Sequence, residues 1–316
     1  MAKHTPRSRS AGGESSVSVR PILKWAGGKR QLLPALRPFY PRAFVRYAEP
    51  CLGSGAVFLD CYNSGRLQVH EVRLSDNNAD VIGCYRMVRD DVEATIAALL
   101  ELERGHQSAA RDHFYEVRDN RFNRERAAAR SASDPSAAYT PELSAMLIYL
   151  NRTGYNGLFR VNSRGAFNVP IGRYADPVIC DPDNLRRWSR ALSSPGLSLE
   201  RHPFQTALAG LERDDFVYLD PPYAPVSSTA RFTAYTATGF DAADQDHLQR
   251  AVLELAATGV HVLLSNSFAP DVKRLYAGSE ALAAGLTARI VPARRAINSR
   301  AAGRGVVREY LITNVR

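Results

Sequence analysis

AEPCLGSGAVFLD, residues 48–60, reads as the end of a strand, a glycine-rich loop and the start of a helix. Gly53 and Gly55 suit a tight turn, and the apolar AVFLD run suits a helix packed on a sheet. Such a loop after a parallel strand is where α/β proteins bind nucleotide-like ligands, although a glycine pair can also be an ordinary turn. A dinucleotide fingerprint would need a third glycine where Phe58 stands, so the pattern disfavours NAD.

Seven segments are predicted to be strands, because they are short, rich in branched or aromatic residues, and bounded by Gly, Pro, Asn or Asp. They are residues 44–50, 69–76, 197–203, 215–222, 260–267, 286–292 and 306–315. Apolar spacing near 3.6 predicts helices at 78–90 and 241–259, and Asp241 can cap the second one. Alternating strands and helices predict an α/β fold with a mostly parallel sheet covered on both faces.

The middle of the chain interrupts this alternation. Residues 86–138 are helix-prone and charged, 142–151 are predicted to form a buried helix, and 158–172 a hairpin that turns at 163–165. The predicted division is a disordered basic tail at 1–18, a discontinuous catalytic and cofactor-binding domain at 19–83 and 181–316, and a mainly helical insertion at 84–180 that carries the hairpin.

The charge of the chain favours an anionic partner. Its formal net charge is +9 and its pI about 9.6. Residues 151–173 hold four arginines and no acid, and residues 289–316 hold seven arginines against Glu309 alone. Arginines interleaved with aromatic and small polar residues are typical of a surface that follows a phosphate backbone. The alternative interpretation is that both stretches are ordinary solvent-exposed faces. Together with the motifs below, the pattern favours nucleic acid.

Other classes of protein are disfavoured. No apolar run approaches the roughly 20 residues that span a bilayer, and the first eighteen residues lack the apolar core of a secretory signal. The four cysteines have neither metal-site spacing nor the density of a disulfide framework. We therefore expect a protein of the reducing cytoplasm, with no membrane partner and no metal. The cysteines are Cys51, Cys61, Cys84 and Cys180.

Two predicted strands end in carboxylates that suit a binding site. Residues 69–76 end in Asp76, where an acid can accept hydrogen bonds from both hydroxyls of a ribose. Residues 215–227, DFVYLDPPYAPVS, end a buried strand in Asp220, two prolines and Tyr223. Pro221 fixes the turn, so that its carbonyl and Asp220 can accept from one exocyclic amino group while Tyr223 stacks on the heterocycle.

This turn is predicted to polarise an amine. A planar base amine is a poor nucleophile because its lone pair is delocalised into the ring. Two fixed acceptors favour a more pyramidal nitrogen and stabilise the positive charge that develops during attack. The predicted catalytic residues are Asp220, Pro221, Pro222 and Tyr223.

The whole pattern resembles the Dam-type bacterial DNA adenine-N6 methyltransferases, the D12 class, from about residue 20 to residue 313. DPPY is shared by many amino-methyltransferases, whereas WAGGK before the glycine loop and the NRTGYNGLFR block are more specific. The resemblance is carried by LKWAGGKRQLLP (23–34), AEPCLGSGAVFLD, LSDNNADVI (74–82), LNRTGYNGLFRVNSRGAFNVPIGRY (150–174), DPPYAP (220–225) and RRAINS (294–299).

The resemblance implies a Rossmann-like methyltransferase that uses S-adenosylmethionine, with residues 84–180 as the DNA target-recognition domain. The implied cofactor-binding residues are Trp25, Ala26, Gly28, Lys29, Glu49, Pro50, Gly53, Gly55, Asp76 and Asp220. The implied DNA-binding residues are Lys24, Arg152, Tyr155, Asn156, Leu158, Arg160, Asn162, Pro170, Arg294 and Arg295. Cys51 departs from the family, which has Phe there, and this puts cofactor affinity in question.

In the implied reaction, adenine N6 of double-stranded DNA receives the methyl group directly, after the base has flipped into the pocket at residues 220–223. The resemblance of the block at 155–160 implies GATC, or a related GAT-containing site such as GATATC, as the target. Lys24 and Arg160 are implied to contact guanines, Leu158 a thymine, and Tyr155 and Asn156 the opened base pair. We expect a monomer that works near the bacterial nucleoid, in restriction protection, repair or regulation.

Two alternatives stay open. The acceptor could be cytosine N4, RNA adenine or a protein amide, because a polarising Asp/Asn-Pro-Pro-aromatic turn serves all of these. The arginine-bearing insertion and the WAGGK segment favour adenine in duplex DNA. A non-enzymatic DNA-binding protein could also retain this fold, and Cys51 is the residue that points that way.

Overall fold

Seven strands form one sheet in the described part of the chain, in the order β3-β2-β1-β4-β5-β7-β6. The computed structural model describes residues 17–25, 29–223, 240–294 and 306–316. The strands are β1 (Arg46–Glu49), β2 (Glu71–Asp76), β3 (Leu197–Arg201), β4 (Phe216–Leu219), β5 (His261–Ser267), β6 (Thr287–Arg294) and β7 (Val306–Thr313). All seven predicted strands are therefore present, and their ends differ from the prediction by a few residues. The predicted tail lies almost wholly outside the described residues.

The sheet is mostly parallel, as predicted. Strands β3, β2, β1, β4 and β5 run parallel to their neighbours, whereas β7 runs antiparallel to both β5 and β6. The carboxyl ends of the five parallel strands meet at one edge, which is where ligands bind in open α/β sheets.

Helices cover both faces of the sheet. Successive residues of a strand point to opposite faces, so each face carries apolar side chains that the helices bury. Tyr47 and Phe216 belong to one core, and Ala48 and Val217 to the other. The first core packs against α1 (Leu33–Leu36), α2 (Ala56–Asn63), α3 (Ala79–Asp90) and α7 (Pro182–Leu192). The second packs against α8 (Phe204–Ala207), α9 (Ala242–Thr258), α10 (Pro270–Tyr276) and α11 (Ser279–Ala283). Asp241 caps α9 as predicted, in a capping box with Asp244.

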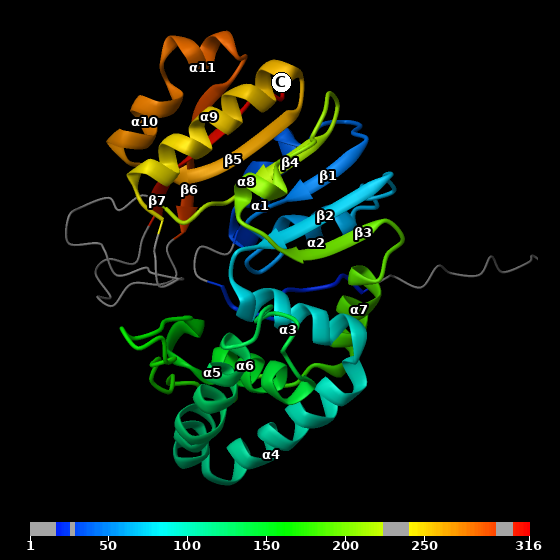
Figure 1. Cartoon of the computed structure of the whole chain (residues 1–316), viewed down its shortest axis with the longest axis vertical. Helices are drawn as coiled ribbons and strands as arrows, with labels where there is room; N and C mark the ends of the chain where they lie inside the picture. The colour runs from blue at the N-terminus through cyan, green and yellow to red at the C-terminus, as the bar shows by residue number, and fades with distance from the viewer. Residues whose placement is uncertain (1–16, 26–28, 224–239, 295–305) are drawn as a thin grey trace, which may run out of the picture.

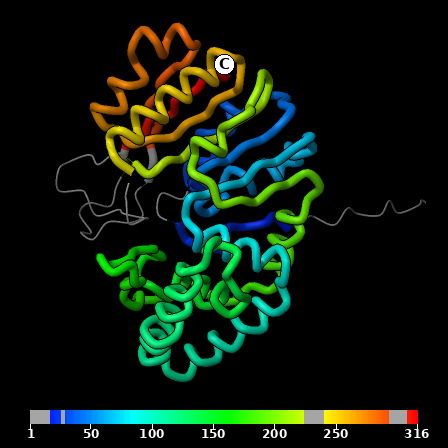
Figure 2. The backbone as a smooth tube through the Cα atoms, in the orientation of Figure 1, coloured from blue at the N-terminus to red at the C-terminus, as the bar shows by residue number. Residues whose placement is uncertain are grey.

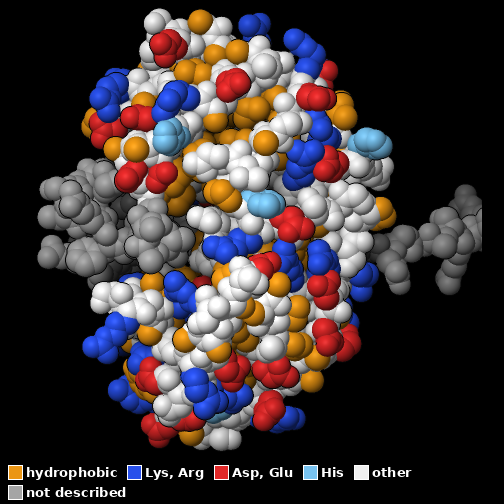
Figure 3. All heavy atoms as spheres, viewed as in Figure 1, with side chains coloured by type: hydrophobic (Ala, Val, Ile, Leu, Met, Phe, Trp, Pro, Cys, Tyr) orange, Lys and Arg blue, Asp and Glu red, His pale blue; other side chains and the backbone are white. Residues whose placement is uncertain are grey.

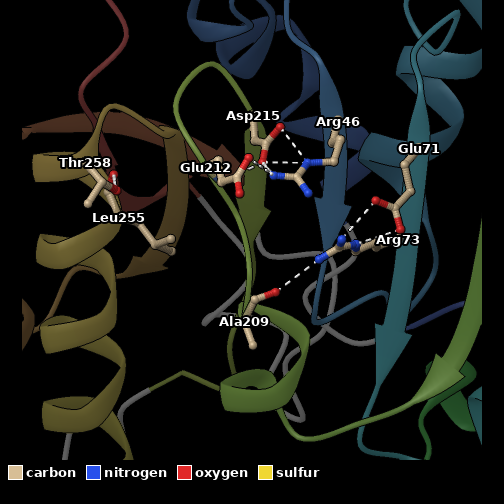
Figure 4. Close-up of polar contacts among 8 residues, drawn as sticks. All are labelled: Arg46, Glu71, Arg73, Ala209, Glu212, Asp215, Leu255 and Thr258. Atoms are coloured by element: carbon tan, nitrogen blue, oxygen red, sulfur yellow. Dashed lines mark hydrogen bonds and ion pairs between the residues drawn. The ribbon is translucent and has the colours of Figure 1, made fainter.

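A buried ion pair holds the amino-terminal ends of β1 and β4 together (Figure 4). The Arg46 guanidinium lies against the Asp215 carboxylate, with Nη2 2.6 Å from Oδ2 and Nε donating at 2.9 Å to the same oxygen. The Asp215 side chain is 1% exposed and also accepts from the Glu212 backbone N–H at 2.7 Å. This pair fixes two adjacent strands at the end opposite the predicted site.

The insertion forms a helical lobe at the other end of the molecule from α9, α10 and α11 (Figure 1). It contains α4 (Val92–Tyr115), a π-helical turn (Glu116–Phe122), α5 (Asn123–Arg130) and α6 (Pro141–Thr153). Helix α6 is buried along almost its whole length, as predicted, and its apolar residues join the same core as α3. The predicted boundary at residue 84 falls within α3. The division into domains stays a prediction.

The hairpin predicted at 158–172 is present in reduced form. The chain turns at 162–166, where Gly165 donates to the Asn162 carbonyl at 2.8 Å. Cross-strand pairing is limited to two isolated bridges, Val161 with Phe167 and Gly154 with Ile171. Side chains from the neighbouring helix bind several backbone groups on the outer edge of this segment.

Residues 17–25 run between the sheet and the helical lobe (Figure 2). The Arg20 carbonyl accepts from Trp188 Nε1 at 2.6 Å and from Asn184 Nδ2 at 2.8 Å. The Lys24 backbone N–H donates to Asn151 Oδ1 at 2.6 Å. The segment is therefore part of the folded structure. Within the described residues, no helix has both the length and the apolar character needed to cross a membrane.

Candidate functional site

Three acids lie close together at the carboxyl ends of β1, β2 and β4. Glu49 and Asp76 are the last residues of β1 and β2, and Asp220 directly follows β4. Because β1 pairs with both β2 and β4, their tips are neighbours, and the charges of Asp76 and Asp220 both act on Glu49. Sequence analysis predicted each acid at a strand tip, and the sheet order brings the three into one site.

The glycine loop after β1 requires glycine at two positions. Gly53 and Gly55 have φ values of 48° and 64°, in the left-handed region that side chains disfavour. A Cβ on Gly53 would lie 2.8 Å from Trp25 Cδ1, and one on Gly55 would lie 2.9 Å from Trp188 Cη2. The Gly53 N–H donates to Asp76 Oδ2 at 2.9 Å, so the loop is tied to the tip of β2.

Glu49 and Asp76 are acids that hold their protons more strongly than usual. Burial raises the pKa of Glu49 to about 8, although Tyr47 Oη and the Phe58 N–H donate to its Oε2 at 2.7 and 2.8 Å. Burial raises the pKa of Asp76 to about 6, against the effect of the backbone donors Asn78 and Gly53. A cation bound beside them would favour the ionised form of both acids.

Asp220 is held by residues from two other segments. Lys29 Nζ lies 2.8 Å from its Oδ1, and Ser265 Oγ, on β5, donates to the same oxygen at 3.0 Å. Burial raises the pKa of Asp220, and both the Lys29 charge and the Ser265 hydrogen bond oppose this rise. In the described part of the chain both side-chain contacts end on Oδ1, so Oδ2 can accept from a further donor.

Tyr223 is oriented through its hydroxyl and its ring. Its Oη donates to Glu309 Oε2, on β7, at 2.7 Å. Lys29 Nζ lies 4.7 Å from the centroid of its ring. Burial raises the pKa of the Tyr223 phenol well above its usual range, so the group stays a neutral donor to Glu309. The aromatic side chain of this turn is therefore fixed beside the carboxylate of Asp220.

The turn at residues 220–223 is also held by its backbone. Gln245 Nε2, on α9, donates to the Pro222 carbonyl at 3.2 Å, and Asn266 Nδ2 donates to Gln245 Oε1 at 3.2 Å. Gln245 is 5% exposed and Asn266 is fully buried. A buried chain of amides thus fixes the proline turn to the neighbouring strand.

Sequence analysis missed four residues of this site. Ser265 and Asn266 could have been found from their position near the end of a predicted strand, and Glu309 as the one acid in a basic stretch. Gln245 lies in a polar part of a helix and has no distinguishing signal.

Cys51 lies in the site as a thiol that stays protonated. Burial raises its pKa well above the usual range, and the charge of Asp76 acts in the same direction. A neutral thiol is a weak nucleophile. The described residues contain no group of three or more His, Cys, Asp or Glu side chains arranged to hold a metal.

Several predicted DNA-binding residues come together around Lys24. Its Nζ donates to the Arg152 carbonyl at 3.2 Å and lies 4.2 Å from the centroid of the Tyr174 ring. Burial lowers the pKa of Lys24, and the charge of Arg152 adds to the effect. Arg152 itself donates to the Ile22 carbonyl at 2.9 Å and the Pro21 carbonyl at 3.1 Å, so its guanidinium fixes the amino-terminal segment.

The remaining predicted DNA contacts lie along residues 155–170. Tyr155, Asn156 and Leu158 are half-buried, whereas Arg160 and Asn162 are exposed on the turn. Asn156 has a φ of 55°, a left-handed conformation that asparagine tolerates better than most residues. Arg160 Nε donates to Asn168 Oδ1 at 2.8 Å. Pro170 is exposed, and its carbonyl accepts from the Tyr155 N–H at 2.8 Å.

Some predicted site residues lie in parts of the chain that the structure does not describe. Ala26, Gly28 and Arg295 lie outside the described residues, and only the backbone of Arg294, at the end of β6, is described. On the face seen in Figure 3, the basic and acidic side chains of the described residues are interspersed.

Comparison with known proteins identifies related sequences along nearly the whole chain. The profile of the D12 class N6 adenine-specific DNA methyltransferases matches residues 25–289. The type II methyltransferase M1.LlaDCHI of Lactococcus lactis subsp. cremoris is 33% identical over 95% of this chain and 97% of its own. The type II methyltransferase M.MjaIII of Methanocaldococcus jannaschii is 35% identical over 83% and 89%. The DNA adenine methylase of Escherichia coli K12 is 32% identical over 92% and 94%.

Proposed function

The chain belongs to the D12 class of N6 adenine-specific DNA methyltransferases, and we propose that it methylates an adenine flipped out of duplex DNA, with S-adenosylmethionine as methyl donor. The observation that carries the proposal is the position of Asp220 and Tyr223. A fixed carboxylate and a fixed aromatic ring meet at the tip of β4, beside the glycine loop and Asp76. One half of the site suits a nucleoside-like cofactor and the other suits a planar amine.

The chemistry of the site suits S-adenosylmethionine. That molecule carries two positive groups and one carboxylate, and Glu49, Asp76 and Asp220 place three carboxyl groups around the glycine loop, whose ionised forms a bound cation would favour. Asp76 can accept from ribose hydroxyls. Asn78, two residues further on, has a buried Nδ2 without a hydrogen-bond partner among the described residues, so a donor is also available there.

The residues of the turn have separate roles in the proposed reaction. When bound, the cofactor supplies a sulfonium methyl group that is already activated for transfer. Asp220 Oδ2 and the Pro221 carbonyl accept hydrogen bonds from N6, which favours a pyramidal nitrogen and stabilises its developing positive charge. Lys29 and Ser265 favour the ionised form of Asp220. Stacking on Tyr223 offsets part of the few kcal/mol that base flipping costs.

We further propose that the enzyme acts as a monomer and reads GATC or a related GAT-containing site through residues 155–162. Arg160 is exposed at the turn, and guanidinium groups bind guanine O6 and N7 in a bidentate manner. Lys24 lies beside the same segment, because a Cβ on Gly157 would clash with the Lys24 Cβ.

The direct test is to methylate unmodified plasmid DNA with methyl-labelled S-adenosylmethionine and to map the modified bases by sequencing. We expect N6-methyladenine at a single GAT-containing sequence, and loss of transfer in Asp220→Ala with DNA binding largely retained. Label on cytosine, or label on RNA in preference to duplex DNA, would contradict the proposed acceptor. Undiminished turnover by Asp220→Ala would contradict the proposed role of the turn.

A further inference from the structure

We propose that Asn123 and Arg126, on α5, are positioning residues for target recognition. They hold the backbone of residues 160–169, which we call the reading segment, in the conformation from which Arg160 and Asn162 reach DNA. This inference rests on the proposed function, since it takes the reading segment to contact the target. Neither residue belongs to a motif that sequence analysis identified.

Side chains of the helical lobe bind one edge of the reading segment at alternate residues. Asn123 Nδ2 donates to the Phe167 carbonyl at 3.0 Å, and the Phe167 N–H donates to Asn123 Oδ1 at 2.7 Å. Arg126 Nη1 donates to the Gly165 carbonyl. Arg118, in the π-helical turn, donates through Nη1 to the Val169 carbonyl at 3.1 Å.

This arrangement replaces the partner strand that the segment would otherwise need. Residues 165, 167 and 169 present their backbone groups on the same side, as residues of an extended chain do. On the other edge, the Asn162 N–H donates to the Ala166 carbonyl at 2.9 Å and the Asn168 N–H to the Arg160 carbonyl at 3.1 Å. A short two-stranded turn of this kind is at best marginally stable alone, so the side chains of α5 decide its conformation.

Arg126 is itself anchored to the sheet domain. Its Nε donates to Asp80 Oδ1 and its Nη2 donates to Asp80 Oδ2, each at 2.7 Å. The side chains of Arg126 and Asp80 are each 6% exposed. Tyr139 Oη donates to the same carboxylate. Because separating a buried, bidentate ion pair leaves an uncompensated charge, the guanidinium is held in one place. The third nitrogen of the guanidinium, Nη1, therefore holds the Gly165 carbonyl and fixes the turn there.

Asp80, which anchors Arg126, is also connected by hydrogen bonds to Asp76 at the tip of β2. Asp80 lies in the first turn of α3, and its N–H donates to Asn78 Oδ1 at 2.9 Å. The Asn78 N–H in turn donates to Asp76 Oδ1 at 2.8 Å. A continuous series of hydrogen bonds thus runs from the acid at the tip of β2, through Asp80 and Arg126, to the turn of the reading segment.

The test compares sequence discrimination in three variants. Asn123→Ala removes two hydrogen bonds to the reading segment at a half-buried position, and Arg126→Gln removes both the contact with the Gly165 carbonyl and the fork to Asp80 that anchors the side chain. Arg124→Gln is the matched control, since it makes the same chemical change at an exposed position of the same helix. For each protein, kcat and KM are measured on a duplex with the mapped target and on duplexes with one base pair changed, and cofactor Kd by calorimetry.

We expect discrimination between the two kinds of duplex to fall about tenfold in Asn123→Ala, mainly through a higher KM for the target, because two hydrogen bonds are lost. Cofactor Kd should stay within about threefold of wild type, since the backbone donors to Asp76 remain. If Arg126→Gln does not fold, Asn123→Ala alone decides the matter. A loss of thermal stability with unchanged discrimination would make the contacts merely structural and overturn the inference. A wild-type enzyme that methylates no DNA would instead overturn the proposed function.

Discussion

Removing the hydroxyl of Ser265 should shift the pH dependence of the reaction. Ser265 Oγ donates at 3.0 Å to Asp220 Oδ1 and stabilises the ionised carboxylate, whose pKa burial raises. In Ser265→Ala the pKa of Asp220 should therefore rise further. Because the carboxylate must be ionised to accept from N6, the acidic limb of the kcat/KM profile should move to higher pH.

The size of the shift follows from the type of hydrogen bond. A hydrogen bond to a charged group contributes about 1.5–3 kcal/mol. One pKa unit corresponds to about 1.4 kcal/mol, so the limb should move by about one to two pH units. On the acidic side of the limb the variant should be about 10- to 100-fold slower than wild type, and it should approach the wild-type rate at pH values well above the new limb.

The assay is the initial rate of labelled methyl incorporation into target duplex between pH 5 and 9.5. Ser64→Ala serves as control, because this hydroxyl bonds to the Asp60 carbonyl at the end of α2, away from the site. A limb that stays in place in Ser265→Ala, with a rate lowered equally at all pH values, would refute the reasoning. The serine would then position the turn without affecting the ionisation of Asp220.

Three further predictions concern the cofactor site and the sheet. Arg46→Met should lower the free energy of unfolding by about 3–5 kcal/mol, measured by denaturant titration, because it leaves the Asp215 carboxylate buried without its partner. A loss below about 1 kcal/mol would show that the ion pair does not stabilise the two strands. Gly53→Ala should weaken cofactor binding at least about tenfold in calorimetry, because φ is positive there and Trp25 stands in the way; unchanged Kd would show that the loop can adjust. Cofactor affinity should rise about tenfold as the pH increases towards about 8 and level off above it, because the cationic ligand favours the ionised Glu49 carboxylate. Glu49→Gln should remove this rise, and a rise that persists in the variant would assign it to another group.

Local patterns were enough to predict the sheet and the acids at its edge. Strand residues such as those of β4 are short, apolar and followed by a carboxylate and prolines, and Gly53 and Gly55 mark the loop after β1. These signals are confined to a few neighbouring residues, so they can be read directly from the chain. The resemblance to the D12 class then added the family, which the comparisons confirm.

The partners of the catalytic turn could not be predicted in the same way. Ser265 is 45 residues from Asp220, and Glu309 is 86 residues from Tyr223. Which strand tips become neighbours depends on the order of the sheet, and a local pattern does not contain that order. The support of residues 160–169 by α5 was also beyond prediction, because Asn123 contacts a residue 44 positions away.

The sheet order has a consequence for the synthesis of the protein. Arg46 and its partner Asp215 are separated by 169 positions, and β4 is the strand that covers the second edge of β1. Ribosomes add about 5–20 residues per second, so β1 waits roughly ten to thirty seconds for this neighbour. During that interval the nascent chain exposes a strand edge with unpaired backbone N–H and C=O groups, on which other chains can aggregate. We therefore expect the yield of soluble enzyme to depend on chaperones and on a low expression temperature.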